Sequence, residues 1–396
     1  MCRYQLGHDS VQDISKLSEP WKSYYQALIY FKAGIDIDKS VKILNKLIIK
    51  NGSNPEFIYR LGLLLMLDEQ YEKACPLLEQ AYNKTPEINY TISLARCWLG
   101  WGKINKLHPL LSGILKEGVT HDQIKAGTKI LETARSYKQI INKEIMTALK
   151  NTRSSLKAGN SGKALDFLEQ TAKKYPGYAV IHYLMAVIHL RLGNRSGSVV
   201  ELDRALKIDP TDPDVHYLLG FLFRQTMQYS RALAHLNMSV KFNPFNIKAH
   251  AMIKEIYTIA ENYRAASEIQ RRIIILNGEK GIADLLTELG QYEEKSGDLD
   301  SSLETHLKVL KKQGDDAGYM SLISIARIYI KLSMKYPEKS IVYRKKARKY
   351  ADRAYAVRPV DPEVNAIRKE LGIEKDSKSD FEKKMKISGA TRVEEN

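Results

Sequence analysis

Histidines, carboxylates and hydroxyls are the residue types that could carry acid–base, nucleophilic or metal chemistry in this sequence. His182 and His189 lie seven residues apart, so one helical face could hold both, but neither has a carboxylate or another histidine at i+4 spacing. His8, Asp9 and Ser10 are adjacent in the sequence. Catalytic triads are brought together by folding from separate parts of a chain, so this adjacency does not indicate a triad. The sequence has no HExxH, no GxSxG and no glycine-rich phosphate loop. We therefore expect no catalytic residue, no metal site, no cofactor and no enzymatic activity.

The three cysteines are Cys2, Cys75 and Cys97. An odd, sparse count without a CxxC pair indicates neither a disulfide framework nor a zinc site. We expect buried or incidental thiols in a reducing compartment. The N-terminus has no basic segment followed by an apolar core, and the longest strongly apolar run, residues 61–67, is far below the roughly 18 residues that span a bilayer. These features predict a cytoplasmic protein.

The charge balance indicates what kinds of partner the chain could meet. With 62 basic and 46 acidic residues the net charge is +16, while 44% of the residues are hydrophobic. The hydrophobic content predicts a packed, soluble protein. The basic excess is compatible with acidic proteins, nucleic acid or an anionic membrane surface, and says nothing about the fold.

The elements that must position any site come from an internal repeat of 34 residues. Pro210 has a proline 34 residues before and after it, and Ala232 has small residues at the same spacing. The unit around Gly220 predicts a first helix over 213–226, a turn near 227–228 and a second helix over 229–242. Several registers with one period indicate an array of helix pairs.

The small residues at fixed places in this unit resemble those of the tetratricopeptide repeat family. Gly220 lies midway along the first helix, Ala232 lies early in the second, and Ser239 follows it. In the family such residues let the paired helices approach closely, which would explain a glycine inside a helix. The resemblance implies an all-α fold, a right-handed superhelical solenoid of helix-turn-helix repeats. We count nine repeats, of which five are convincing alone.

The same pattern predicts how the chain divides. Residues 1–20 form an N-terminal segment and 21–121 a block of about three repeats, the last of them degenerate. Residues 122–144 hold one extra helix, 124–141, as a junction that bends the array or separates two blocks. The main array of about six repeats, with a capping helix over 360–372, occupies 145–372. The polar segment 373–396 is expected to be a mobile tail.

In the family, the first helices line a concave groove that binds extended peptides or helices. The positions that the family exposes inward carry tyrosine, aliphatic residues and arginine, which are residue types enriched at binding hot spots. An equal alternative is that the tyrosines simply pack neighbouring first helices together. The residues expected to line this partner-binding groove are Tyr25, Tyr59, Arg153, Tyr183, Val187, Tyr217, Phe221, Arg224 and Arg327.

The resemblance implies a non-catalytic scaffold or adaptor that binds a peptide or helix of another protein and assists assembly of a multiprotein complex. Members that hold the acidic tails of heat-shock chaperones use an asparagine at the ninth position of the repeat. No unit of this chain has it. That role is disfavoured, although an acidic peptide could still meet the arginines. Self-association through repeat surfaces is a further alternative.

A basic face is the second candidate surface. The segment 335–358 has nine Lys or Arg residues and two acids. It could bind an anionic membrane surface or nucleic acid, whereas a solvated helical face is the simpler interpretation. Nucleic acid is less favoured, because the units lack the recurring polar pair of an RNA-reading repeat. The basic face comprises Arg344, Lys345, Lys346, Arg348, Lys349 and Arg353.

Overall fold

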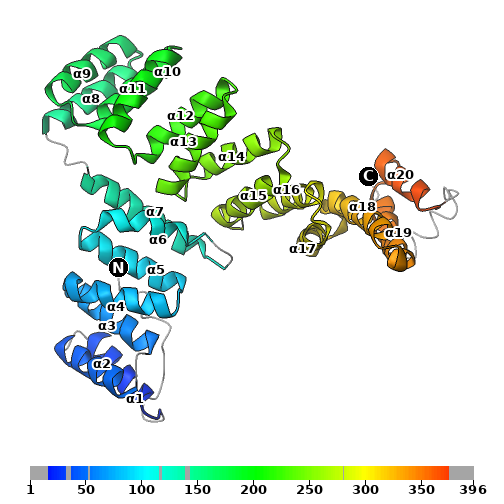
Figure 1. The fold of residues 1–396 in the computed structure, drawn as a ribbon, viewed down its shortest axis with the longest axis horizontal. Coiled ribbons are helices and arrows are strands. Elements are labelled where there is room, and N and C mark those ends of the chain that lie inside the picture. The colour runs from blue at the N-terminus through cyan, green and yellow to red at the C-terminus, as the bar shows by residue number, and fades with distance from the viewer. Residues whose placement is uncertain are drawn as a thin grey trace, which may run out of the picture. The chain divides into compact units, whose positions relative to one another are not determined.

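The structure, a computed structural model, describes residues 17–32, 37–51, 54–115, 118–138, 143–279 and 281–373. In these residues every regular element is a helix, as predicted (Figure 1). The 1–16 and 374–396 segments, with His8, Cys2 and the expected mobile tail, lie outside the described residues. Two compact units are present, 1–249 and 250–396, so the predicted junction at 122–144 lies inside the first unit.

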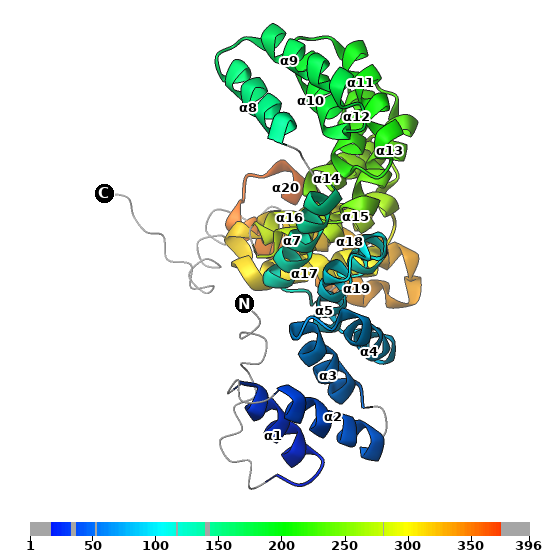
Figure 2. The ribbon, with the colours of Figure 1, turned by 90° about the vertical axis from the view of Figure 1, so that its left-hand side faces the viewer.

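Consecutive helices follow the chain order of the predicted repeats, with α7 and α20 as the two single helices. The first repeats are built from α1 (Trp21–Lys32), α2 (Ile37–Asn51), α3 (Pro55–Leu67), α4 (Tyr71–Lys84), α5 (Ile88–Gly100) and the short α6 (Leu107–Ser112), followed by α7 (His121–Lys138). The next are α8 (Lys143–Lys157), α9 (Ser161–Lys174), α10 (Ala179–Arg191), α11 (Arg195–Ile208), α12 (Pro213–Gln225) and α13 (Tyr229–Phe242). The last are α14 (Ile247–Ile259), α15 (Tyr263–Asn277), α16 (Ile282–Lys295), α17 (Leu299–Ala317), α18 (Tyr319–Lys335), α19 (Ser340–Val357) and α20 (Pro362–Glu370). Figure 2 shows α8 to α11 as neighbouring helices from a second direction.

Glycine is used where the two helices of a pair approach most closely. A β-carbon on Gly220 would lie 2.6 Å from Cγ of Leu236 in α13, and one on Gly62 would lie 2.8 Å from Cγ of Leu78 in α4. In α16, a β-carbon on Gly290 would lie 2.6 Å from Nε2 of His306. These side chains fill the space that the glycine leaves open, so burial of the partner offsets the roughly 1 kcal/mol that glycine costs a helix.

The turns inside several of the described pairs share one backbone conformation. Gly159 and Gly193 have positive φ, and so do the non-glycine residues at the equivalent places, Met227 (φ 57°), Glu261 (φ 53°) and Glu69 (φ 59°). A left-handed conformation disfavours a side chain, because Cβ crowds the next carbonyl. The sequence located these turns correctly, but three of them hold strained residue types.

Replacing Met227 with glycine should therefore stabilise the α12–α13 pair by about 1 kcal/mol, because the side chain is 75% exposed and contributes little packing. Thermal unfolding and hydrogen exchange of α12 and α13 would measure the change. Met320→Gly is the matched control, since Met320 is exposed but helical and its loss should destabilise by about 1 kcal/mol. Equal destabilisation by both substitutions would contradict the strain argument.

The first unit contains a disulfide, which corrects the expectation of free thiols. Cys75 in α4 and Cys97 in α5 are both buried and joined by a bond between their sulfur atoms, with 5.6 Å between their Cα atoms. The side-by-side packing of α4 and α5 brings together cysteines that are 22 residues apart. The cysteine count therefore no longer favours a reducing compartment.

The extra helix α7 is tied to the main array within the first unit. It covers 121–138, close to the predicted 124–141, and packs against α5 and α6. A β-carbon on its Gly127 would lie 2.6 Å from the ring of Phe245, so the α13–α14 loop approaches α7 closely. Its Arg135 donates hydrogen bonds to Asp212 and Asp214 at the start of α12, at 2.9 and 2.6 Å. The predicted junction is thus a packed element of the first unit.

The second unit ends with a helical hairpin and one further helix. The α18–α19 hairpin is followed by α20, which lies within the expected capping segment 360–372. Asp361 caps α20 by accepting from the backbone N–H groups of Glu363 and Val364. Arg368 of α20 contacts Asp352 of α19 and covers the ring of Tyr355. The right-handed superhelix of the whole chain stays a prediction.

Candidate functional site

A hollow of about 770 Å³ opens along the first helices α8 and α10. Its apolar lining consists of Met146, Leu149, Leu156 and Leu184, and Met146 is 54% exposed. Its charged lining consists of Lys150, Arg153, Lys157 and Arg191. No residue of the second helices α9 and α11 lines it. The hollow therefore belongs to the first-helix face, where the sequence placed its groove.

The electrostatics of this hollow are one-sided. All four cations are exposed, and none forms an ion pair with another described residue. The single carboxylate of α8, Glu144, is taken by Lys174 and accepts a hydrogen bond from Tyr175 at 2.6 Å. Helix α10 has no carboxylate. An anionic group arriving at the hollow meets positive charge without competition from a neighbouring acid.

Other predicted groove residues lie on α10, which also lines the hollow, and on α12, and we call this group the strip. Tyr183 and Val187 on α10, and Tyr217 and Phe221 on α12, are all half-buried, so each offers part of its side chain. Burial raises the pKa of both tyrosines, and at Tyr183 the nearby Asp214 adds to the rise. Both hydroxyls therefore stay protonated at neutral pH. Arg224, the last predicted residue of this strip, is also half-buried.

Two other predicted groove residues, Tyr59 and Tyr25, contact aromatic side chains of the same chain. Tyr59 is only 5% exposed, its ring stacks on Tyr90 at 4.1 Å and its hydroxyl lies 2.9 Å from Oγ of Ser93. It packs neighbouring first helices, which was the alternative interpretation of the tyrosines, and has little surface left for a partner. Tyr25 is half-buried, with its ring edge-on to Tyr24.

Arg327 carries charge that is balanced within the second unit. Its guanidinium donates to Glu363 at 2.5 Å and lies 3.8 Å from the carboxylate of Glu294. Two of the predicted groove arginines therefore differ in their ion pairing. Arg153 is exposed and without a described ion-pair partner, whereas Arg327 is held by two carboxylates.

The predicted basic face on α19 is divided in the same way. Three of its six cations have described partners: Arg344 donates to the carbonyl of Glu370, Lys346 lies over the Tyr329 ring, and Arg353 pairs with Asp315. The other three are exposed and form no ion pair with a described residue; they are Lys345, Arg348 and Lys349.

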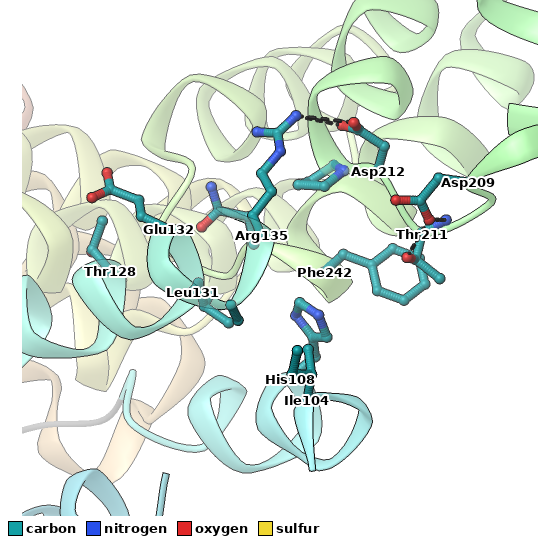
Figure 3. A pocket seen from close by; sticks show the side chains of 13 residues that line it. Ile104, His108, Thr128, Leu131, Glu132, Arg135, Asp209, Thr211, Asp212 and Phe242 are labelled. Carbon is teal, nitrogen blue, oxygen red and sulfur yellow. Dashed lines mark hydrogen bonds and ion pairs between the residues drawn. The ribbon is translucent and has the colours of Figure 1, made fainter. Parts of the chain in front are cut away.

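A second, small hollow of about 90 Å³ lies where α6 and α7 meet the loops before α12 and after α13. Figure 3 shows Arg135 pointing across it to Asp212, with His108 and Phe242 on the other side. Its volume suits a few water molecules. Arg135 and Asp212 already form an ion pair with each other, so we interpret this hollow as part of the packing between α7 and the array and not as a binding site.

Sequence reasoning missed most of the cations of the first hollow. Lys150, Arg153 and Lys157 recur at spacings of three and four, so they share a face of α8, and this pattern could have been found from the sequence. Arg191 could not, since it joins them only through the packing of α10 beside α8. Among the described residues no cluster of metal-ligating side chains was found, and His182 instead lies 2.7 Å from the carboxylate of Glu201.

Within the described part of the chain, no helix is both long enough and apolar enough to cross a membrane.

Comparisons with known proteins give one family-model match and several similar solved structures. A family model described as tetratricopeptide repeat matches residues 155–220. No curated protein sequence matches the chain. Similar solved structures include MamA from Desulfovibrio magneticus RS-1, with 21% identity, a TM-score of 0.35, and 43% of this chain and 95% of that chain covered. Another is PilF of Pseudomonas aeruginosa, with 17% identity, a TM-score of 0.34, and 57% of this chain and 96% of that chain covered. A third is YrrB, a TPR protein with an unusual peptide-binding site, with 16% identity, a TM-score of 0.38, and 51% of this chain and 97% of that chain covered.

The matched residues 155–220 run from the end of α8 to Gly220 of α12 and include both helices of one complete pair, α10 and α11. The pairs that flank this stretch keep the same positive-φ turn, and Gly220 lies opposite a large buried side chain. Residues 155–220 are therefore similar to the tetratricopeptide repeat family, within a chain whose described residues form an all-α array of helix pairs.

Proposed function

We propose that the protein is a non-catalytic scaffold or adaptor that binds a peptide or helix of another protein along the first-helix face of α8, α10 and α12, and so assists assembly of a complex. The observation that carries this proposal is the hollow between α8 and α10, with its apolar lining and four cations without described ion-pair partners. On this face the alkyl groups could contact apolar side chains of a partner, and the cations could contact its acidic side chains.

The strip next to the hollow supplies the other half of a binding face. Tyrosine contributes a large, rigid, amphipathic surface with little loss of side-chain entropy. Tyr183, Tyr217 and Phe221 are half-buried, so they are held in place by neighbours and still expose part of the ring. A bound segment could place apolar side chains on this strip and acidic side chains near Arg153 and Arg191.

The test begins with affinity capture from the native cell extract by the full chain. Tyr217→Ala/Phe221→Ala and, separately, Arg153→Gln/Arg191→Gln should each weaken binding of the captured partner at least tenfold, because each removes groups of the proposed face. Isothermal titration with the purified partner gives the affinities. The arginine variant should also lose part of the salt dependence, since it removes charges that attract the partner.

The matched control is Phe167→Ala/Leu307→Ala, which removes two exposed apolar side chains from the second helices α9 and α17. Circular dichroism and melting establish that each variant stays folded. Partner binding that is unchanged in both groove variants, or weakened equally by the control, would reject the first-helix face as the site. Light scattering on the free protein separates partner binding from self-association.

A further inference from the structure

The turn end of the α18–α19 hairpin combines exposed aliphatic side chains with exposed cations. Met334 near the end of α18 is 66% exposed, and Ile341 and Val342 at the start of α19 are 86% and 55% exposed. Most other apolar residues of α18 are buried, so this exposure needs an explanation. The α18 and α19 helices pack side by side, so these three residues lie at one end of the hairpin. We call this end, residues 334–349, the hairpin tip.

Cations surround the aliphatic residues of the hairpin tip. The exposed charged side chains here are Lys335, Glu338, Lys339, Lys345, Lys346, Arg348 and Lys349. All but Glu338 are basic, and none forms an ion pair with a described residue. The next acid along α19, Asp352, already contacts Arg368 of α20. The tip therefore presents a positive field around an apolar centre.

An aromatic ring anchors this arrangement at the turn. Tyr336 lies between the two helices, with the ammonium groups of Lys335 and Lys339 at 5.4 and 6.0 Å from its ring centre and the ring of Tyr343 at 6.3 Å. Tyrosine and lysine are amphipathic side chains that place an apolar stem or ring in one medium and a polar end in water. Such residues suit the boundary between a lipid headgroup layer and the acyl chains.

We propose that the hairpin tip docks the protein on an anionic lipid surface. Ile341, Val342 and Met334 would enter the interface, while the surrounding lysines meet lipid headgroups. Nucleic acid needs only the cations and leaves the aliphatic residues unexplained. An extended peptide is best held in a groove, whereas these residues lie at the turn of a hairpin. The site lies in the second unit and is independent of the proposed groove of the first.

The test is flotation of the full chain with phosphatidylcholine vesicles, with and without phosphatidylserine, at physiological salt. Wild type should bind only the vesicles that contain phosphatidylserine. Lys345→Gln/Lys349→Gln should weaken this binding by about 25-fold, since each lysine near an anionic surface strengthens it about fivefold. Ile341→Ser/Val342→Ser should weaken it roughly tenfold or more, because two aliphatic side chains no longer leave water.

Matched controls separate the tip from the general basic excess. Val360→Ser changes a side chain that is 89% exposed beyond the other end of α19, and Lys42→Gln/Lys46→Gln removes two exposed lysines of α2 at the same spacing of four. Both controls should bind as wild type does. Circular dichroism establishes that the variants fold, and the lysine pair keeps the test decisive if the serine pair does not.

Three results would overturn the proposal. One is absence of binding to vesicles with phosphatidylserine. Another is equal loss in the tip variants and in the controls, which would assign the binding to net charge alone. The third is binding of a polyuridine RNA or a polyglutamate peptide that depends on the tip while vesicles do not bind, which would assign the surface to another anionic partner.

Discussion

Replacing Gly220 with valine should remove about 3 kcal/mol from the stability of the α12–α13 pair, the upper end of the range for overpacking a filled core. A β-carbon at this position would lie 2.6 Å from Cγ of Leu236 and 3.3 Å from the carbonyl oxygen of Ala232. Leu236 is fully buried, and the carbonyl belongs to helix backbone, so neither can move away without disturbing the next contact. Hydrogen exchange of α12 and α13 and thermal unfolding would measure the loss.

The control uses the same substitution at a glycine with free space. A β-carbon on Gly162 in α9 would have no neighbouring atom within 4 Å, so Gly162→Val should be neutral or slightly stabilising. Combining Gly220→Val with Leu236→Ala should cost less than the sum of the two single changes, because the shortened side chain gives room to valine. Equal effects of valine at Gly220 and Gly162 would contradict close packing as the reason for the glycine.

The 34-residue period predicted the helices and turns because both depend on local chemistry. The second helix expected over 229–242 begins and ends at those residues, and the first ends one residue early. The period could not predict the conformation of Met227 and Glu261, since their residue types disfavour the positive φ that the turn requires. In these units the packing of the two helices overrides the local preference.

The disulfide was beyond sequence reasoning for a different reason. Cys75 lies in the second helix of one unit and Cys97 in the first helix of the next, so no fixed motif relates them. Only the packing of α4 beside α5 brings their sulfur atoms together. A cysteine count tests for known spacings, and it cannot detect a pair that depends on tertiary contact.

The candidate site shows the same limit. Helical periodicity placed Tyr59 and Tyr183 at equivalent positions of two repeats. The residue 34 positions later differs between the two. Tyr59 is buried with its hydroxyl 2.9 Å from Oγ of Ser93, whereas Tyr183, which has Tyr217 at that position, is half-buried. A single-unit pattern therefore predicts the face of a side chain, while its exposure depends on the neighbouring unit.

Lowering the pH from about 7.5 to about 5 should destabilise the α16–α18 region by about 2 kcal/mol through one buried histidine. Burial lowers the pKa of His306 to about 4, against an ordinary value near 6.5, with the Glu294 carboxylate opposing and Arg327 assisting the shift. Nδ1 of His306 lies 3.0 Å from Oγ of Ser321, and its side chain fills the space beside Gly290. Between pH 6.5 and 4 the unfolded chain binds the proton and the folded chain does not, so stability falls as the pH falls.

The matched variant comes from the repeat itself. Leu78 and Leu236 occupy the place of His306 beside Gly62 and Gly220, so His306→Leu restores the side chain that two other pairs use. Ser321→Ala is added because the serine would otherwise lose its buried partner. The double variant should keep the fold near pH 7.5 and lose the acid-dependent part of the destabilisation.

Hydrogen exchange of α16, α17 and α18, corrected for the intrinsic dependence of exchange on pH, measures this local stability in the full chain. Carboxylates with ordinary or lowered pKa values stay ionised down to about pH 5, so they do not obscure the histidine signal. His121→Gln changes an exposed histidine of α7 and should leave the pH dependence of this region unchanged. If His306→Leu/Ser321→Ala loses as much stability on acidification as wild type, the protonation of another group governs the second unit. If the loss disappears, the histidine at the place where two other pairs have leucine gives the α16–α18 region its response to acid.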